Sequence, residues 1–410
     1  MTAGLTATAD PAPDLIRLIT RAFMQDPYPS LRDLRARGRA VPIENNGMRM
    51  WVVTGYADAR DLLADQDMKK DLWAKRREIL QKTEVRQGRR PRLPRELRRN
   101  LLDRDEPDHS RLKAVIGTTF GTAAAHGLRG KIEKLAADLL DTVPVGEPVD
   151  LLAVYTRPLS MTIIADELGI PDPDRADFPI WENDILTSPD IALIEESSRA
   201  IVEFAREQLA RKERDPGDDL LTRVVRARAE GVVDDDEAVS TITVLLTAGM
   251  EPGSAIGNGV FTLLRHPAEL AKLLADPGLM PGCVEEILRF ESPFRMLTPR
   301  FCDEPIDIGG TRIPANELIL VSAAAANRDP DRFPDPDRFD ITRNSTGHLS
   351  FGRGEHRCLG PRLGRLEVQV ALTALLSRFP ALRLAETPAA SWRTGMFMRR
   401  LDTLPVVLAS

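Results

Sequence analysis

The sequence is poor in cysteine and has no long uninterrupted hydrophobic run. Its 410 residues include only three cysteines, Cys283, Cys302 and Cys358. Their odd number and wide spacing exclude a disulfide framework and a zinc site of paired cysteines, and favour a reducing compartment. The longest apolar stretches, around Leu245–Leu246 and Leu318–Ala326, are too short to cross a membrane. We therefore expect no membrane partner.

Excess positive charge is also absent from the chain as a whole. The net charge is -6, which argues against a general nucleic-acid-binding protein. The N-terminal residues MTAGLTATADPAPD lack the basic start and apolar stretch of a signal peptide, so residues 1–20 are expected to form a disordered lead-in. No repeat or low-complexity linker divides the remainder. We expect residues 21–410 to form one cytoplasmic, globular enzyme domain, because 42% hydrophobic residues suffice for a large core.

Helical spacing of apolar residues dominates the chain. The pattern predicts helices over residues 198–211, 219–229, 236–265, 267–275, 282–290 and 360–378. Short strands are predicted at 48–54, 306–308, 312–313 and 318–322, with a turn at Gly309–Gly310. Three prolines interrupt residues 327–340, which should therefore form an ordered loop. The sequence thus predicts a mainly α protein with a small β subdomain.

One segment departs from the acidic average. Residues 69–104 contain fourteen lysines or arginines and five acidic residues, a net charge of +9. The simpler interpretation is a solvated amphipathic helix and loop. The alternative is a docking surface or pocket entrance for an anionic molecule.

The most informative short stretch is FGRGEHRCLG, from Phe351 to Gly360. Its glycines at 352 and 354 permit a tight turn that approaches a flat ligand closely. Cys358 stands just before a predicted helix, where backbone N–H groups and the helix dipole favour a thiolate. Such a thiolate is a suitable axial ligand for haem iron. Taken alone, Cys358 is equally compatible with a small buried packing residue.

This stretch resembles the haem-binding loop of the cytochrome P450 family, F-G-x-G-x-H-x-C-x-G, at every fixed position. Further motifs follow in the family order from about residue 26 to 406. Glu286 and Arg289 match the E-x-x-R helix, and Arg338 in DPDRF is expected to complete its ion triad. DEPDHSRLK (105–113) resembles the helix under the haem, and residues 395–406 the C-terminal hairpin. The resemblance implies a single-domain cytochrome P450-like fold.

The resemblance also implies the cofactor haem b, iron–protoporphyrin IX, with the Cys358 thiolate as axial ligand. Its propionates need cations or hydrogen-bond donors when buried. The residues that match family positions for binding the haem are His109, Lys113, Arg300, Phe351, His356 and Gly360. Lys113 replaces the usual arginine, keeping the charge but losing the bidentate geometry.

The long helix matches the family pattern A-G-x-[D/E]-T only in part. Ala248, Gly249 and the acid Glu251 are present, but Pro252 replaces the threonine. The small pair would let the helix lie close over the iron, and Pro252 should kink it. The missing hydroxyl leaves three routes for protons: Glu251 with ordered water, a polar group of the substrate, or, less favoured, Ser254.

Family position assigns the substrate pocket to two groups of residues. One group is the arginine-rich 86–95 stretch, for which exposure to solvent is the alternative. The other comprises Thr247, Met250, Phe294, Leu297 and Met396, of which Leu297 and Met396 are alternatively core-packing residues.

The resemblance implies a haem–thiolate monooxygenase that oxidises a small organic substrate, a natural product of secondary metabolism. Electrons should come from a separate ferredoxin and its reductase, docked on Arg111, Lys113, Arg357 and Arg362. Because of Pro252, oxidative coupling or cyclisation without oxygen insertion stays open, as does peroxide-driven oxidation. An alternative of another class is a haem-binding sensor or carrier without turnover.

Overall fold

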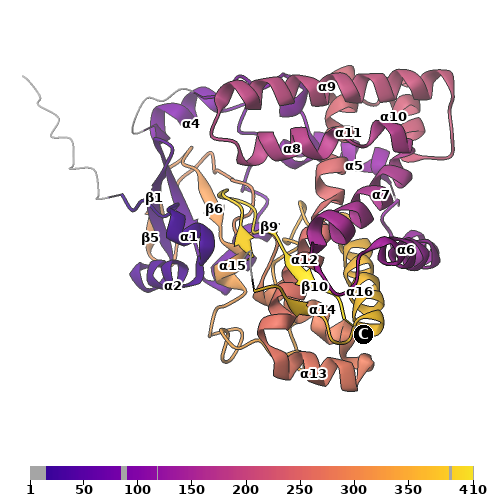
Figure 1. Ribbon diagram of the computed structural model, residues 1–410. Coiled ribbons are helices and arrows are strands. Elements are labelled where there is room, and N and C mark those ends of the chain that lie inside the picture. The colour runs from indigo at the N-terminus through magenta and orange to yellow at the C-terminus, as the bar shows by residue number, and fades with distance from the viewer. Residues whose placement is uncertain (1–14, 85–89, 118, 387–389, 410) are drawn as a thin grey trace, which may run out of the picture.

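Helices make up most of the molecule, and the strands from the N-terminal part of the chain lie at one side of it (Figure 1). The computed structural model describes residues 15–84, 90–117, 119–386 and 390–409. The prediction of a mainly α protein with a small β part is confirmed. No helix within the described ranges is long and apolar enough to cross a bilayer.

The sheet nearest the N-terminus joins a hairpin to one distant strand. Strands β1 (Ala40–Asn45) and β2 (Met48–Val53) pair antiparallel, and β2 pairs in parallel with β6 (Ile319–Val321). Asn46 and Gly47 connect the hairpin with positive φ angles, as a two-residue turn between twisted strands requires. This sheet therefore brings residues 40–53 beside residues 319–321.

Residues 15–20 correct the expected N-terminal lead-in. Ile16 forms a parallel bridge with Ile43 of β1, and Leu18 is buried in the cluster beneath the sheet. Backbone pairing and burial thus hold this stretch against the domain. Residues 1–14, the rest of the expected lead-in, lie outside the described residues.

Three smaller sheets complete the β part. Strands β4 (Ile306–Ile308) and β5 (Thr311–Ile313) form a hairpin whose turn is Gly309–Gly310, as predicted. The strands near the C-terminus pair over longer distances in sequence. These are β3 (Pro148–Asp150), β10 (Pro405–Val407) and β7 (Arg383–Leu384) in one sheet, and β8 (Ser391–Trp392) with β9 (Leu401–Thr403) in another.

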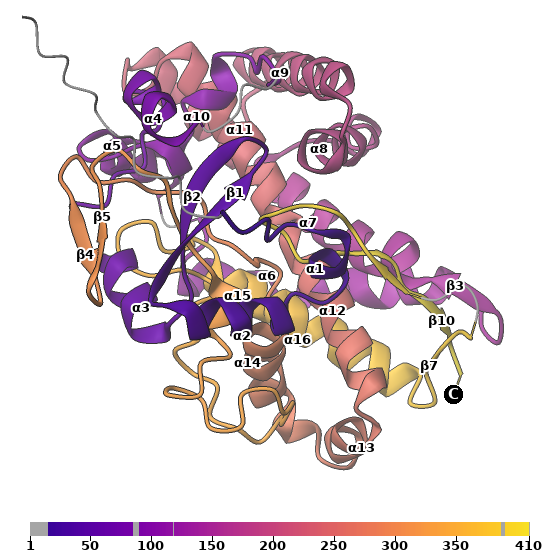
Figure 2. The ribbon, with the colours of Figure 1, turned by 90° about the vertical axis from the view of Figure 1, so that its left-hand side faces the viewer.

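The helices fall into two groups, seen from the β side in Figure 2. Those with the N-terminal sheet are α1 (Arg21–Gln25), α2 (Tyr28–Arg37), α3 (Tyr56–Ala64), α4 (Arg76–Thr83) and α15 (Ala323–Ala326). The helical body contains α5 (Asp108–Ile116), α6 (Thr122–Thr142), α7 (Arg157–Leu168), α8 (Phe178–Thr187), α9 (Ile191–Arg214), α10 (Leu220–Ala229), α11 (Asp235–Gly249), α12 (Glu251–Arg265), α13 (Pro267–Ala275), α14 (Met280–Phe290) and α16 (Pro361–Arg378). Short turns of 3-10 helix occur at Glu96–Arg98, Leu101–Asp103, Asp172–Asp174 and Pro277–Leu279, and a π-helical turn at Leu152–Thr156.

The long helix predicted over 236–265 is two helices with a break at Met250. α11 begins with a reciprocal capping box between Asp234 and Glu237, as its acidic start indicated. Pro252 lies in the first turn of α12, where its missing N–H is tolerated. The expected kink is therefore present as a boundary between two helices.

Three glycines around this break let neighbouring helices approach closely. A Cβ at Gly249 would lie 2.2 Å from Ile164 of α7, and one at Gly253 would lie 2.7 Å from the Thr156 carbonyl oxygen. Gly257 would meet Leu152 in the same way. The small residue at 249, expected to let the helix lie close over the iron, is thus also required by helix packing.

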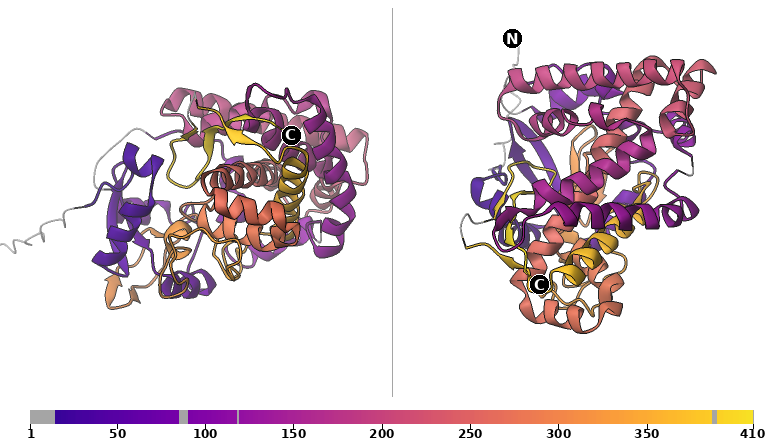
Figure 3. Two further views of the ribbon diagram at one scale, coloured as in Figure 1. Left: turned by 60° about the horizontal axis from the view of Figure 1, so that its bottom comes forward. Right: turned by 45° about the vertical axis from the view of Figure 1, so that its right-hand side comes forward.

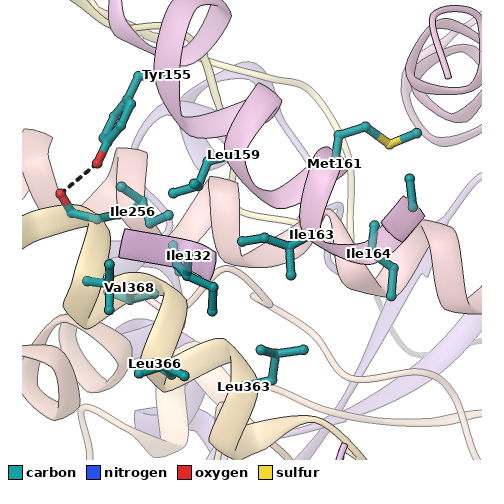
Figure 4. Close-up of a cluster of buried hydrophobic side chains, with 14 of the residues drawn as sticks. Ile132, Tyr155, Leu159, Met161, Ile163, Ile164, Ile256, Leu363, Leu366 and Val368 are labelled. Carbon is teal, nitrogen blue, oxygen red and sulfur yellow. Dashed lines mark hydrogen bonds between the residues drawn. The ribbon is translucent and has the colours of Figure 1, made fainter. Parts of the chain in front are cut away.

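The core fills the space among α6, α7, α12 and α16. Ile132, Leu159, Ile256 and Leu363 come from these four helices and point into one buried cluster (Figure 4). Tyr155 lies in the same cluster and donates a 2.9 Å hydrogen bond to the Ala371 carbonyl. α12 and α16 run side by side through the middle of the molecule (Figure 3). Their packing fixes the helix break opposite the start of α16.

Substituting Gly253 with alanine should destabilise the protein by about 1–3 kcal/mol, since the added methyl group overlaps a backbone carbonyl that cannot rotate away. Urea unfolding followed by circular dichroism measures the change. Gly127 of α6 is the matched control, because a Cβ there meets no atom within 4 Å. G127A should gain about 0.5–1 kcal/mol; equal effects of the two variants would contradict the close approach.

Candidate functional site

A cavity of about 290 Å³ lies between the helix break and the loop that precedes α16. Its walls are mostly apolar and come from segments far apart in sequence. Those apolar side chains include Leu101, Phe120, Val244, Leu245, Phe294 and Leu297. Cys358 lines the cavity on the loop side, and Pro252 lines it on the helix side. The cavity therefore places a lone thiol opposite the helix break.

The cysteine loop is shaped by its glycines. Gly352 and Gly354 have φ angles of 66° and 74°, in the left-handed region that favours glycine. A Cβ at Gly354 would lie 2.3 Å from the Leu63 carbonyl oxygen, so the loop also packs tightly on α3. The Cys358 N–H donates to the Phe351 carbonyl at 2.9 Å. The predicted tight turn is present.

The loop supplies the groups that the sequence predicted around the Cys358 sulfur. Desolvation raises the pKa of this thiol and, in the absence of a bound metal, outweighs the Gly360 N–H and the charges of Arg357 and Arg365, which lower it. Coordination to a metal would deprotonate the thiol outright.

One end of the cavity gathers four basic side chains. Lys70, His109, Arg300 and His356 all line it. The histidine rings lie 4.2 Å apart, and the Lys70 ammonium donates to the Thr298 hydroxyl. The guanidinium of Arg300 has no hydrogen bond or ion pair with the described residues. This end of the cavity therefore fits a ligand that carries negative charge.

The pKa values of these groups reflect burial among like charges. Burial, together with the charge of Arg300, lowers the pKa of Lys70 to about 7. Burial also lowers the pKa of Arg300 to about 10. The pKa of His356 falls to about 2 through burial and the charges of Lys70, His109 and Arg300. A bound anion would relieve this mutual repulsion.

Of the two residues expected on one face of α5, only His109 reaches the cavity. His109 is buried, with its Nδ1 3.0 Å from a carboxylate oxygen of Glu355. Lys113 is half-exposed and does not line the cavity. The four-residue spacing keeps both on the same side of the helix, but Lys113 lies one turn farther along.

The predicted ion triad contains the wrong arginine. Arg289 binds Glu286 through two hydrogen bonds of 2.7 and 2.8 Å, as expected. Arg338 does not reach Glu286; its side chain is 62% exposed and lies 3.6 Å from Asp340. Arg343, 12% exposed, places its Nε 3.6 Å from Glu286. The DPDRF motif instead supplies two backbone carbonyls, those of Pro336 and Arg338, which accept from Arg289 at 2.9 and 3.3 Å.

The expected residues of the helix break face the cavity. Ala248, Gly249, Glu251 and Pro252 all line it. Ser254 instead lines a second cavity on the opposite face of α12. An α-helix turns by 100° per residue, so a position two residues after Pro252 points away from the cysteine. Ser254 is therefore not placed to replace the missing threonine hydroxyl.

The expected pocket residues divide into two groups. Phe294 and Leu297 line the cavity with the thiol. Met250 lines the second cavity, Met396 packs in the cluster beneath the N-terminal sheet, and Thr247 lines neither cavity. Of the arginine-rich stretch 86–95, residues 86–89 lie outside the described residues, and Arg90, Arg92 and Arg95 do not line the cavity.

Known proteins resemble this chain over nearly its whole length. The family model described as Cytochrome P450 matches residues 187–390. Cytochrome P450 107B1 of Saccharopolyspora erythraea is 39% identical over 97% of this chain and 99% of its own. The chain belongs to the cytochrome P450 family.

Solved P450 structures share its fold. The tirandamycin C-bound P450 monooxygenase TamI has a TM-score of 0.89 at 37% identity, covering 95% of this chain and 99% of its own. CxnD, a P450 enzyme for C–S bond formation in chuangxinmycin biosynthesis, has a TM-score of 0.88 at 32% identity, covering 98% and 99%. The protein is therefore an oxidoreductase of the P450 monooxygenase class.

P450 proteins carry a haem with a cysteine thiolate as axial ligand, and the residues present here fit that group. The cavity offers one thiol, Cys358, and apolar walls for a macrocycle. Its cationic end matches the two propionates in charge, because Lys70 and Arg300 have no carboxylate bound to their charged groups among the described residues.

Lys70 lines the cavity with Cys358, and sequence reasoning did not single it out. It stands in the basic run Lys69–Asp71, which reads as a solvated surface. Its burial at 2% exposure comes from contacts with Thr298 and with the segment before α5, where the Asp105 carboxylate accepts from the Lys70 backbone N–H. No local pattern signals either contact.

Replacing Lys70 with methionine should stabilise the cofactor-free protein but weaken haem binding. Removing a buried, unpaired ammonium should raise the free energy of unfolding at pH 7 by about 1 kcal/mol or more. Loss of a charged donor to a propionate should speed haem transfer to an acceptor globin by about 30-fold. Lys69→Met, at the neighbouring half-exposed position, should change neither quantity.

The pH dependence of the same group has a definite sign. The pKa of Lys70 is about 7 in the folded, cofactor-free protein and 10.5 in the unfolded chain. The unfolded state therefore binds more protons between these values, so stability should rise as the pH increases from 7 to 10. K70M should flatten this rise in unfolding experiments; an unchanged slope would contradict the assignment.

The corrected ion triad predicts a large loss of stability when one arginine is replaced and almost no change when the other is replaced. Arg343→Ala should cost about 3 kcal/mol, because it leaves the buried Glu286 short of a cation. Arg338→Ala should change the stability by less than about 0.5 kcal/mol, since that side chain is exposed. Urea unfolding of the two haem-loaded variants measures both; a larger loss for R338A would restore the family motif.

Proposed function

We propose that this P450 oxidises a small, mostly apolar natural product at a haem whose iron is ligated by Cys358. The observation that carries the proposal is the opposition of a lone thiol and a broken helix across one cavity with unpaired cations at its end. Those three features supply an iron ligand, room for an oxidant and substrate, and anchors for the propionates.

The chain's own residues would hold the cofactor at both faces and at its edge. Cys358 would ligate the iron, with the Gly360 N–H donating to its sulfur. Lys70, Arg300 and the two histidines would bind the propionates. When bound, the haem supplies the activation of dioxygen, and the thiolate donates electron density that favours cleavage of the O–O bond.

The apolar walls would orient the substrate and exclude water. Val244, Leu245, Phe294 and Leu297 present hydrocarbon surface to the cavity. An apolar substrate gains free energy by leaving water for such a wall, while few polar groups remain to fix its orientation. Ala248 leaves space at the helix break, where a larger side chain would fill the cavity.

Protons would reach the cavity through Glu251. Its Oε2 is buried and has no hydrogen-bond partner among the described residues. Pro252 offers neither a hydroxyl nor an N–H group, so the relay from Glu251 would pass through water or a polar group of the substrate. Ser254 does not serve, because it faces the second cavity.

Electrons would come from a separate ferredoxin and its reductase. Of the four cations expected to dock it, Arg111 is held by Glu237 and Asp108. Lys113, Arg357 and Arg362 form no ion pair with the described residues and keep their charge for an acidic partner. The proposed docking surface therefore contains three of the four cations that the sequence indicated.

The basic 69–104 segment is a weaker candidate for anion binding than its charge implies. Arg95 pairs with Asp236, and Arg99 pairs with Asp234, both at 2.6 Å. Arg104 pairs with Asp71 at the same distance. These contacts join the segment to the start of α11 and to itself, so much of its charge is structural.

Pro252 favours a second candidate reaction, oxidative coupling or cyclisation of the substrate. A substrate O–H, N–H or S–H would then supply the group that the missing threonine does not. The related structure of CxnD concerns C–S bond formation, which has this character. In this alternative no oxygen atom enters the product.

Two measurements test the proposal. The reduced protein under carbon monoxide should show the strongly red-shifted Soret band of thiolate ligation, and Cys358→His should shift the band to that of histidine ligation. A red-shifted band that survives in C358H would refute the assignment. A substrate is first identified by the spin-state shift that it causes in the ferric protein. When this substrate is oxidised under labelled dioxygen, the label should appear in the product. An unlabelled product formed while dioxygen is consumed would favour coupling.

A further inference from the structure

Glu251 belongs to a buried cluster of two acids and one arginine. Arg400 donates to Glu182 through two hydrogen bonds of 3.1 and 2.7 Å, and its Nη2 also contacts Glu251 Oε1. Glu182 lies on α8, Glu251 at the start of α12, and Arg400 just before β9. All three are less than 9% exposed. Tertiary packing alone brings these elements together.

The cluster lies between two cavities. Glu251 lines the cavity with Cys358, whereas Arg400 and Glu182 line a second cavity of about 620 Å³. Around α12, Pro252 faces the first cavity and Ser254 the second. At 100° per residue, Glu251 falls between these two directions. Its carboxylate therefore stands at the border between the cavities.

The second cavity is more polar than the first, although apolar side chains still make up most of its wall. Its lining includes four arginines and several hydrogen-bonding side chains, namely Arg157, Arg175, Arg393, Arg400, Asp172, Asn183, Thr156, Thr162 and Ser254. These side chains could supply the two to four polar partners that each ordered water needs. The first cavity offers such partners mainly at its cationic end.

Three buried polar atoms around the border have no hydrogen-bond partner in the described part of the chain. They are Glu251 Oε2, Arg400 Nε and Thr156 Oγ1. Buried groups of this kind are bridged by ordered water. Arg400 contacts only Oε1 of Glu251, so Oε2 is the oxygen that is free to exchange a proton with such water.

We propose that the 620 Å³ cavity is the aqueous inlet for protons, and that Arg400, anchored on Glu182, is the positioning residue that holds Glu251 across the border. This inference rests on the proposed function and adds its route of proton supply. Arg400 itself touches neither the thiol nor the first cavity.

The transfer balances as the movement of one proton. Glu251 Oε2 accepts it from a hydrated proton in the second cavity, which leaves a water molecule there. The resulting carboxylic acid donates the same proton to water or a polar substrate group in the first cavity, and Glu251 returns to a carboxylate. Only O–H bonds form and break, and the electrons come from the proposed ferredoxin.

Glu182 fixes the guanidinium that holds Glu251. Arg400 donates two hydrogen bonds to Glu182, and these keep its Nη2 beside Glu251 Oε1. The other charged groups that line the second cavity near this pair are Arg157 of α7 and Arg393, whose Nε lies 3.1 Å from Asp402 of β9. Removing Glu182 should therefore release the guanidinium and loosen the Arg400–Glu251 contact.

The test compares two routes of oxidation with thioanisole as the probe substrate. Reductant-driven turnover requires protons from solvent, whereas hydrogen peroxide brings its own. In Arg400→Gln holoenzyme the reductant-driven rate should fall by about tenfold or more, with a larger solvent deuterium isotope effect. The peroxide-driven rate should change by less than about twofold, and Arg400→Lys should recover part of the loss. Glu182→Gln should also slow the reductant-driven route alone.

The matched control is Arg49→Gln, which breaks the ion pair between the half-buried Arg49 and the buried Glu317; this pair lines neither cavity. Its ratio of the two rates should equal that of the wild type. A wild-type ratio in R400Q, or an equal loss by both routes, would overturn the positioning role. A wild-type protein without the red-shifted carbon monoxide band would overturn the proposed function instead.

A measurement without haem tests the cluster itself. In cofactor-free R400Q, two buried carboxylates face one another without their cation. Protonating one of them relieves the repulsion, so the unfolding temperature should fall as the pH rises from 5 to 8 relative to the wild type. The double variant R400Q/E182Q should lose most of this dependence. Parallel curves for R400Q and the wild type would refute the shared contact.

Discussion

The absence of one backbone N–H group at Pro252 shapes the centre of this molecule. Because proline cannot donate within a helix, the long central segment divides at Met250 into α11 and α12. The break lies directly across a cavity from Cys358. Close packing on both sides, which requires glycine at 249 and 253, holds the two helices in place. The same break sets Glu251 at the border between the cavity with Cys358 and a second, more polar cavity.

The electrostatics of the site are set by two cationic side chains that are buried without an ion-pair partner. Lys70 and Arg300 are taken out of water at one end of the first cavity, and no carboxylate of the described residues forms an ion pair with either side chain. The nearby charge of Asp105 offsets only part of the effect of burial on their pKa values. A protein that keeps such cations is less stable than one with an apolar core until an anion binds. In the proposed function the haem propionates would provide that anion. Cofactor binding and folding stability would then be coupled in this protein.

The motif-based predictions succeeded where a residue acts through its immediate neighbours in sequence. The cysteine loop, the Glu286–Arg289 pair and the acidic cap of α11 depend on spacings of ten residues or fewer. Predictions failed where a partner is chosen by packing. Arg338 and Arg343 lie in one loop, and only the path of that loop decides which side chain turns inward to Glu286. Packing likewise decides between two lysines: Lys113 was expected at the cavity but does not line it, whereas Lys70 was not expected there and does.

The sequence by itself determined the family, the helical class, the thiol and the break in the central helix, because each depends on local residue chemistry or on motifs in a fixed order. Only the tertiary structure decided which cations reach the cofactor cavity, which face of α12 carries Ser254, and that Arg400 joins Glu182 to Glu251. The contacts of Arg400 with Glu182 and Glu251 join side chains 218 and 149 residues apart. No local pattern encodes such pairs, since burial and direction are settled only when distant elements pack.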